Sequence, residues 1–255
     1  MVNLINTYDL DGLDFECVHD PSVDLMIPYI FTFTSWEYPG TQGTGCNTVS
    51  SSDTSNFLSF FQLLRSKLAD TIILTAAVSP SPWIGLTDLS GFASLLDYVV
   101  IMNYDYYPPS APGVTQIGPN SPLDESCMPR GALVMGSATK AIQAWSNAGI
   151  PKGQLLLGIP AYGHSYRVLT ANAIAPDGTL NLTASFDSHN LTKGDAWDGP
   201  GGVDICGNET GPGGVWTFWG LVKAGYLNDD GRHSSSVQYK WDNCSQTVCS
   251  SCHPL

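Results

Sequence analysis

Residues 71–105 read TIILTAAVSPSPWIGLTDLSGFASLLDYVVIMNYD, and this stretch decides the fold class. It contains two continuous apolar runs, at 71–79 and 97–105, that are rich in β-branched residues, as expected for strands buried on both faces. A short helix is expected between them, around residues 88–96. A strand, a helix and a second strand in this order are typical of parallel strands joined by a helical crossover.

The same alternation extends upstream of this stretch. LINTYDLDGLDF at 4–15 shows the period-two alternation of a strand, with Leu13 and Phe15 on one face and Asp14 on the other. A helix is expected over 54–68, where apolar residues recur at helical spacing.

Downstream, a helix fits residues 137–149, which Gly149 ends, and a strand fits QLLLGIP at 154–160. The order of strands and helices therefore predicts an α/β fold with parallel strands over residues 1–161.

The character of the chain changes at about residue 162. Residues 162–247 are polar and rich in Gly, Asn and Asp, and only GGVWTFWGLVKAG at 213–225 predicts an ordered element, a short helix. We expect this region to be a separate small α+β domain. The last residues, 248–255, match no pattern and are interpreted as an aberrant tail. Their Cys-x-x-Cys lacks a second pair, so no zinc site is expected.

The composition limits the possible partners. The 255 residues include 10 Lys and Arg against 23 Asp and Glu, a formal net charge of −13. This balance argues against nucleic acid and against anionic membrane surfaces as partners. No apolar run reaches the roughly 18–20 residues of a membrane span. Charged residues are only 13% and aromatic residues 11%, which predicts a compact acidic protein that contacts something uncharged.

Two features indicate the secretory pathway, although the N-terminus does not read as a signal peptide. The first is a set of glycosylation sequons, and the second is the presence of seven cysteines, an odd number that leaves at least one outside any internal pair. We therefore expect an extracellular parent protein of which the start is missing. The sequons begin at Asn181, Asn190, Asn208 and Asn243.

Carboxylates gather at the end of the first predicted strand, at Asp11, Asp14 and Glu16. Asp14 and Glu16 share one face of the strand, and Leu13 and Phe15 take the other. In a parallel barrel, catalytic groups lie at the carboxyl ends of the strands, and an inward carboxylate must be paired. The alternative is a solvated Asp-Gly turn with incidental acids.

DGLDF at 11–15 and WEYPG at 36–40 together resemble the D-G-x-D-x-D-x-E signature of family 18 glycoside hydrolases, the chitinases. LTAAVS, VVIMNYD and GQLLLGIPAYGHSY resemble the three strands that follow that signature in the family. GDAWDGPGGVDICGNETGPGGVWTFWGLV resembles the insertion found in fungal members. The resemblance covers about 5–15 and 36–247. It implies an incomplete (β/α)8 TIM barrel, containing about strands four to seven, with the α+β insertion domain.

The resemblance also implies a chemistry, the retaining hydrolysis of β-1,4-linked N-acetylglucosamine polymers, in which the substrate's acetamido group replaces a protein nucleophile. Glu37 matches the general acid. Asp14 would hold the third aspartate of the motif and help to raise the pKa of the acid. That third aspartate is absent, and Glu16 stands nearest to it. Asp11 would be structural.

Further residues are implied for substrate binding. Tyr104 would donate a hydrogen bond to the acetamido oxygen, with Met102 and Asp105 lining the same subsite. Trp36 and Tyr38 would flank the acid. Tyr162 and Trp83 are candidates for stacking on sugar rings. For Trp83, packing in the core is the alternative. His164 and the other histidines show no metal-ligand spacing and are interpreted as residues without a special role.

The chain departs from the family between the two halves of the signature. Glu16 through Ser35 stand where one aspartate is expected. We interpret residues 17–35 as a retained intron. An Asp codon split by a splice site explains both edges of the segment, at Glu16 and at Ser35. In addition, IFTFTS at 30–35 can be encoded almost wholly by pyrimidines, as the polypyrimidine tract before a splice acceptor requires. The alternative is a genuine surface insertion. Strands one to three and strand eight are also missing, so we expect this chain as written to be nearly inactive and poorly stable.

Four cysteines remain after those of the suspected intron and tail are removed. Cys206 and Cys244 bracket the insertion and are expected to pair, and Cys46 and Cys127 lie in loops where they can pair. No metal-ligand spacing is present, and no cofactor is expected. The expected partner is chitin or chito-oligosaccharides, bound by a monomer.

Two other functions remain open. One is a non-catalytic, lectin-like relative that binds chitin, although such relatives usually lose the acid that Glu37 supplies here. The other is an intact small protein in which the insertion creates a new function, for which residues 17–35 offer no support.

Overall fold

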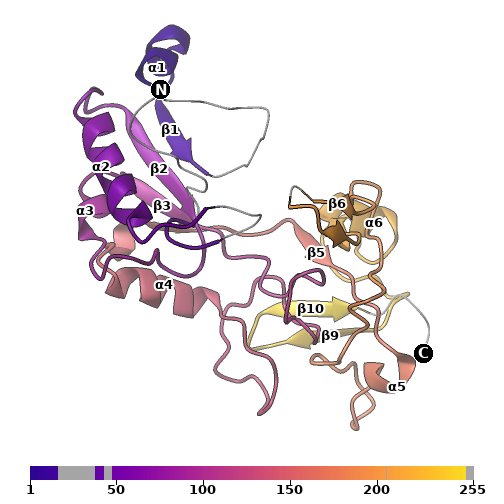
Figure 1. Ribbon diagram of the computed structural model, residues 1–255. Helices are drawn as coiled ribbons and strands as arrows, with labels where there is room; N and C mark the ends of the chain where they lie inside the picture. The colour runs from indigo at the N-terminus through magenta and orange to yellow at the C-terminus, as the bar shows by residue number, and fades with distance from the viewer. Residues whose placement is uncertain (17–37, 43–47, 205, 251–255) are drawn as a thin grey trace. The chain divides into compact units, whose positions relative to one another are not determined.

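The computed structural model describes residues 1–16, 38–42, 48–204 and 206–250. They form two compact units, the first within residues 1–102 and 140–158 and the second within residues 103–139 and 159–255. Figure 1 follows the chain through both. The sequence-based division at residue 161 does not anticipate that residues 103–139 join the second unit.

A parallel sheet forms the centre of the first unit (Figure 1). Its strands are adjacent in chain order, so each pair is joined by a crossover. The α/β class predicted from the alternation is therefore confirmed. The strands are β1 (Gly12–Phe15), β2 (Ile73–Val78), β3 (Tyr98–Ile101) and β4 (Leu155–Leu157).

The helices of this unit follow the predicted order, with one exception at the N-terminus. The segment before Asp9, predicted as part of the first strand, forms helix α1. Only Ile5 of this helix is buried, and Asp9 ends it in the left-handed conformation with its N–H on the Ile5 carbonyl. The period-two pattern therefore holds only over β1. The helices are α1 (Val2–Tyr8), α2 (Asp53–Arg65), α3 (Ser90–Ala93), α4 (Ala138–Asn147) and the 3₁₀ turn η1 (Lys152–Gln154).

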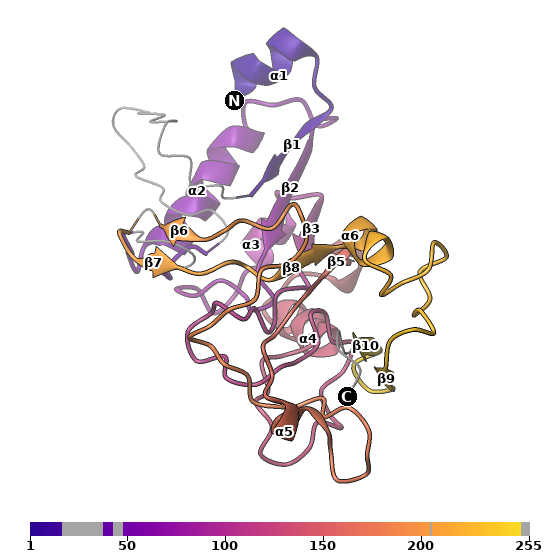
Figure 2. The ribbon, with the colours of Figure 1, turned by 90° about the vertical axis from the view of Figure 1, so that its right-hand side faces the viewer.

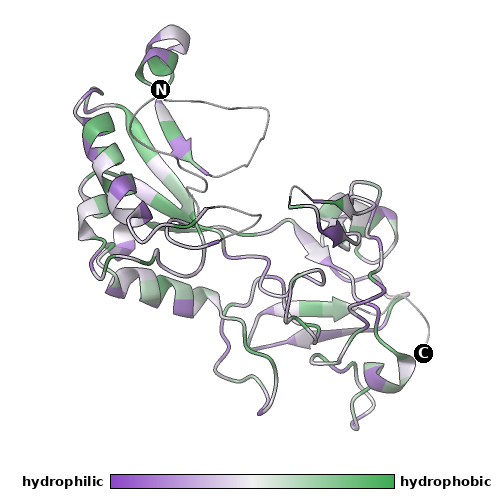
Figure 3. Ribbon diagram, in the orientation of Figure 1, coloured by the Kyte–Doolittle hydropathy of each residue, from purple (hydrophilic) through white to green (hydrophobic). Residues whose placement is uncertain are grey.

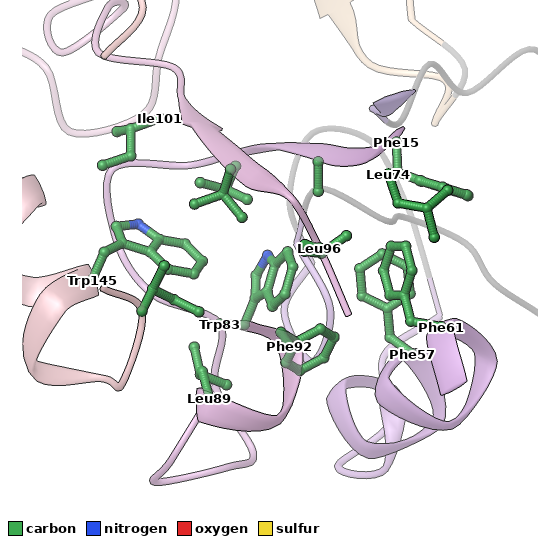
Figure 4. Close-up of a cluster of buried hydrophobic side chains, with 14 of the residues drawn as sticks. Phe15, Phe57, Phe61, Leu74, Trp83, Leu89, Phe92, Leu96, Ile101 and Trp145 are labelled. Atoms are coloured by element: carbon green, nitrogen blue, oxygen red, sulfur yellow. The ribbon is translucent and has the colours of Figure 1, made fainter. Parts of the chain in front are cut away.

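An aromatic core fills the space between these helices and one face of the sheet (Figure 4). Phe57 and Phe61 of α2 point toward the strands, and Trp145 of α4 donates its indole N–H to the Ser79 carbonyl at 2.9 Å. Trp83 lies within this core, 5.2 Å from the Phe57 ring and 5.3 Å from the Trp145 ring, and is only 5% exposed. The structure thus supports core packing for Trp83 and does not support the stacking role on a sugar.

The second unit is built from short antiparallel pairs and loops (Figures 1 and 2). A second cluster of buried side chains, which includes Tyr106, Tyr107 and Phe186, supports it. Residues 248–250, assigned from the sequence to an aberrant tail, pair with β9 as part of β10. The elements are β5 (Tyr162–His164), α5 (Thr170–Ala173), β6 (Gly202–Val203), β7 (Glu209–Thr210), β8 (Val215–Thr217), α6 (Phe218–Lys223), β9 (Tyr239–Asp242) and β10 (Thr247–Ser250).

The disulfide found in the second unit corrects both predicted pairings. Cys244 is bonded to Cys127, with 6.1 Å between their Cα atoms, and not to Cys206. Cys46, the predicted partner of Cys127, lies outside the described residues. The loop that carries Cys127 reaches Cys244 because the Leu123 N–H donates to the Ser245 carbonyl at 2.9 Å.

Apolar residues concentrate in β2 and β3, as Figure 3 shows. Among the described residues, no helix combines the length and the apolar character that crossing a membrane requires.

Candidate active site

The first carboxylate of the candidate site lies on β1, which pairs with β2 so that Asp14 stands beside Thr75. Leu13 and Phe15 turn into the aromatic core, so Asp14 takes the opposite face of the sheet, as its alternation predicts. The Thr75 hydroxyl donates a hydrogen bond to the Asp14 carboxylate. This neighbour gives the carboxylate a fixed partner on the face that carries it.

The start of β1 lies very close to β2. The Asp11 carbonyl accepts a hydrogen bond from the Ile73 N–H at 3.0 Å, and the Asp11 side chain is exposed. A Cβ at Gly12 would overlap the Ile73 carbonyl, so this position requires glycine. The described contact of Asp11 is made by its backbone, so the structural role of its side chain stays a prediction.

The second half of the signature enters the described residues at Tyr38, which is half-buried. The Tyr38 carbonyl accepts a hydrogen bond from the Thr41 N–H at 3.0 Å. Gly40 has a φ of 80° and donates its N–H to the Asp53 carboxylate at 3.3 Å. The turn after the predicted acid is thereby tied to the first turn of α2. Trp36 and Glu37 lie outside the described residues, as does the suspected intron at 17–35.

A second group of predicted residues comes together in the other unit. Tyr104 and Tyr162 meet edge to face with their ring centroids 6.0 Å apart. Asp105 follows Tyr104 in the left-handed conformation, with φ of 58°, and its carboxylate lies 2.8 Å from His164 Nε2. Asn120 connects the two segments, because it accepts the Asp105 N–H at 3.0 Å and donates to the Tyr162 carbonyl at 3.1 Å.

The electrostatics of this group keep Asp105 ionised and Tyr162 protonated. Burial alone would raise the pKa of Asp105, but hydrogen bonds from His164 and Tyr162 outweigh it and hold that pKa below its usual value. Burial, together with the neighbouring Asp105, raises the pKa of Tyr162 far above its usual value. The group therefore presents a carboxylate acceptor beside a phenolic donor, which suits hydroxyl and amide groups of an uncharged ligand.

His164 and Asn120 are parts of this group that the sequence analysis missed. The spacing Tyr162-x-His164 on a strand is a usable signal, because residues two apart share a face. The His164 side chain is 5% exposed, and its Nδ1 has no hydrogen-bond partner among the described residues. For Asn120 no sequence signal exists.

The remaining predicted residue, Met102, lies directly after β3 in the first unit. Its N–H donates to the Val78 carbonyl at 2.8 Å, and its side chain is half-buried. The structure thus describes two sets of candidate residues, each within its own unit. The first set is Asp11, Asp14, Tyr38 and Met102, and the second is Tyr104, Asp105 and Tyr162.

Asp105→Asn should remove a pH-dependent part of the stability. Because the folded-state pKa of Asp105 lies below its ordinary value of 3.8, its ionised form stabilises the fold above that pH, and this stabilisation is lost as the pH falls through the lower folded-state pKa. The side chain is 49% exposed, so the effect is expected to be below about 1 kcal/mol. Urea unfolding of both proteins at pH 6 and pH 3 measures it. The difference in the free energy of unfolding between wild type and variant should shrink at pH 3. A difference that does not change with pH would contradict the lowered pKa of Asp105.

Among the residues that the structure describes, no group of three or more His, Cys, Asp or Glu side chains is placed to hold a metal ion.

Comparison with known proteins connects these residues to a family. The profile described as Glycosyl hydrolases family 18 matches residues 1–248. A chitinase-like effector from Moniliophthora roreri is 41% identical over 220 residues, which cover 84% of this chain and 52% of that protein. A chitinase-like effector from Moniliophthora perniciosa is 36% identical over 256 residues, covering 97% of this chain and 52% of that protein.

Solved structures agree with the profile. The crystal structure of a chitinase from Rhizomucor miehei superposes with a TM-score of 0.77 at 30% identity, covering 97% of this chain and 60% of that chain. The chain spans about half the length of the curated relatives it matches. With the profile match extending over nearly all of its residues, the chain belongs to glycosyl hydrolase family 18.

Proposed function

We propose that the protein acts on chitin and chito-oligosaccharides, and that its correctly spliced form hydrolyses their β-1,4 bonds with retention of configuration. The observation that carries this proposal is the group formed by Tyr104, Asp105 and Tyr162. It combines aromatic rings with a fixed carboxylate and a protonated phenol, which is what an uncharged N-acetylated sugar requires of a binding site.

The catalytic step needs one protein acid and no protein nucleophile. Glu37 donates its proton to the glycosidic oxygen as the bond to the anomeric carbon breaks. The substrate's acetamido oxygen attacks that carbon, and the Tyr104 hydroxyl orients the acetamido group. Water then opens the cyclic intermediate, with the Glu37 carboxylate accepting a proton from it. The product keeps the anomeric configuration of the substrate.

Asp14 has a supporting role in this proposal. Its carboxylate lies on the face of the sheet opposite the helices, held by Thr75. We propose that β1 to β4 are strands four to seven of a (β/α)8 barrel and that this face is the barrel interior. Thr75 and Ala77 lie on this face, where they alternate with the core residues of β2, and both are buried.

The segment 17–35 separates Asp14 from Glu37 in this chain. We propose that it is intron-derived and that the chain as written hydrolyses chitin slowly or not at all. A general acid must lie within about 3 Å of its target, and the third aspartate of the signature is missing.

Binding without hydrolysis is the second candidate. It is favoured by one observation, that two relatives are named chitinase-like effectors and not chitinases. In that case the group around Asp105 would recognise chito-oligosaccharides and Glu37 would have no catalytic use.

An extracellular location is proposed from the glycosylation sequons. Asn190, Asn208 and Asn243 are exposed, whereas Asn181 is half-buried. The first three are therefore the better acceptors for a glycan.

The test is hydrolysis of a soluble fluorogenic chito-oligosaccharide, with proton NMR of the first product formed. We expect the β-anomer first, because the acetamido mechanism retains configuration. The α-anomer first would contradict the mechanism. Binding of the oligosaccharide without turnover, in a protein that reads DGLDFDWEYPG, would favour the second candidate.

A further inference from the structure

Two tryptophans of the second unit line a hollow that the catalytic proposal does not use. Trp197 is 80% exposed and Trp219 is 56% exposed, which is unusual for the largest apolar side chain. With Thr217 they line an open hollow of about 370 Å³. Hollows of this size accommodate small molecules or part of a longer chain.

One carboxylate ties the backbone at Trp197 to Thr217. Asp195 accepts the backbone N–H of Trp197 at 2.8 Å with one oxygen, and accepts both the backbone N–H and the hydroxyl of Thr217, at 2.8 and 2.5 Å, with the other. A Cβ at Gly220 would overlap this carboxylate, so glycine lets α6 approach the turn that carries Trp197. Figure 2 shows α6 directly following β8, the strand that ends with Thr217.

A second carboxylate, that of Asp198, also holds the turn that carries Trp197. Asp198 is 7% exposed and accepts the N–H groups of Gly194 and Gly214 at 2.7 and 3.0 Å. The turn that carries Trp197 is therefore tied to Thr217, at the end of β8, and to Gly214, just before that strand. The backbone of this turn therefore needs little further ordering when a ligand binds.

The lining offers almost no polar group to a ligand. The hydroxyl of Thr217 already donates to Asp195 and accepts the Gly220 N–H at 3.0 Å. The Lys223 ammonium lies 4.6 Å from the centre of the Trp219 ring and covers one face of it, which leaves the other face for a ligand. The ligand must therefore present a flat apolar face and keep its polar groups at the open rim.

A pyranose ring meets these conditions, because its C–H groups form an apolar face and its hydroxyl groups project around the edge. We propose that Trp197 and Trp219 form a stacking site for a β-1,4-linked N-acetylglucosamine chain, separate from the group around Asp105. The choice of this sugar rests on the proposed function. The net charge of −13 makes a phosphorylated or sulfated ligand unsuitable.

The test measures binding of the full chain to insoluble chitin, with Trp197→Ala, Trp219→Ala and the double variant. Loss of a central aromatic contact is expected to raise the dissociation constant about tenfold or more for each single variant. Trp241→Ala is the matched control, since Trp241 is 47% exposed in the same unit but does not line the hollow. The dissociation constant of this variant for chitin should stay within about twofold of the wild-type value. A double Phe variant, which keeps an aromatic ring at both positions, should retain most of the affinity.

Several outcomes would overturn the proposal. A double Ala variant that melts like the wild type and binds chitin equally well shows that the hollow is not the site. If the double variant instead changes the sedimentation of the protein and not its chitin binding, the hollow is a contact between copies. In either case, cleavage of the soluble substrate by the form that reads DGLDFDWEYPG leaves the proposed function standing, whereas a form with that signature that neither cleaves nor binds contradicts both.

Discussion

Glu37→Gln is expected to lower the turnover of a chito-oligosaccharide about 10²–10⁴-fold, the contribution of a positioned general acid. The amide has nearly the same shape as the carboxyl group but cannot deliver a proton to the glycosidic oxygen. Substrate binding should therefore stay within about threefold. Steady-state kinetics with a fluorogenic substrate, in a protein whose signature reads DGLDFDWEYPG, gives the effect on kcat and on KM separately.

Glu209→Gln is the matched control for this experiment, because Glu209 is an exposed glutamate on β7, outside both sets of candidate residues. It should leave turnover unchanged. A Glu37→Gln variant that retains more than about a tenth of the activity would show that another group supplies the proton.

Replacing Glu16 through Ser35 with a single aspartate is expected to raise turnover at least about 100-fold. The replacement restores the third carboxylate of the signature and brings Glu37 to its family spacing from Asp14, and a catalytic group misplaced by as little as about 1 Å can cost that much. Both chains would be assayed at equal folded concentration, which circular dichroism establishes.

A replacement by asparagine in place of aspartate separates the two causes. It restores the spacing without the charge, so it should recover substrate binding but only part of the turnover. If the long chain is as active as the aspartate form, the segment 17–35 is compatible with catalysis and the intron interpretation loses its functional support.

The parallel sheet could be predicted because its evidence is local. β2 and β3 lie within continuous apolar runs, which few other structures explain. Helix α1 could not be predicted, because a short helix with one buried residue has almost no hydrophobic periodicity. The alternation that identified β1 was extended too far toward the N-terminus.

The candidate site was predictable only where a motif carried it. Tyr104, Asp105 and Tyr162 came from the family resemblance, and the structure brings them together in one unit. The partner of Cys127 could not be predicted, since spacing does not determine which of several cysteines pair. His164 was missed because its spacing from Tyr162 indicates a shared face of the strand but does not reveal its carboxylate neighbour, Asp105.

Tryptophan shows the limit of sequence reasoning most directly. Trp83 lies in the core, whereas Trp197 and Trp219 are exposed around a hollow. All three stand in loops or short elements without a clear period, so their burial follows from tertiary contacts and not from local pattern.

The proposed hydrolysis depends on Phe15 and Trp36 being joined through one aspartate in the mature message. Sequencing the transcript across codons 11–40 tests this most directly. We predict that the dominant message encodes DGLDFDWEYPG, which lacks the segment between Phe15 and Trp36 except for one aspartate codon. A dominant message that retains codons 16–35 would contradict the account, because the expressed protein would then carry the insertion within its catalytic signature.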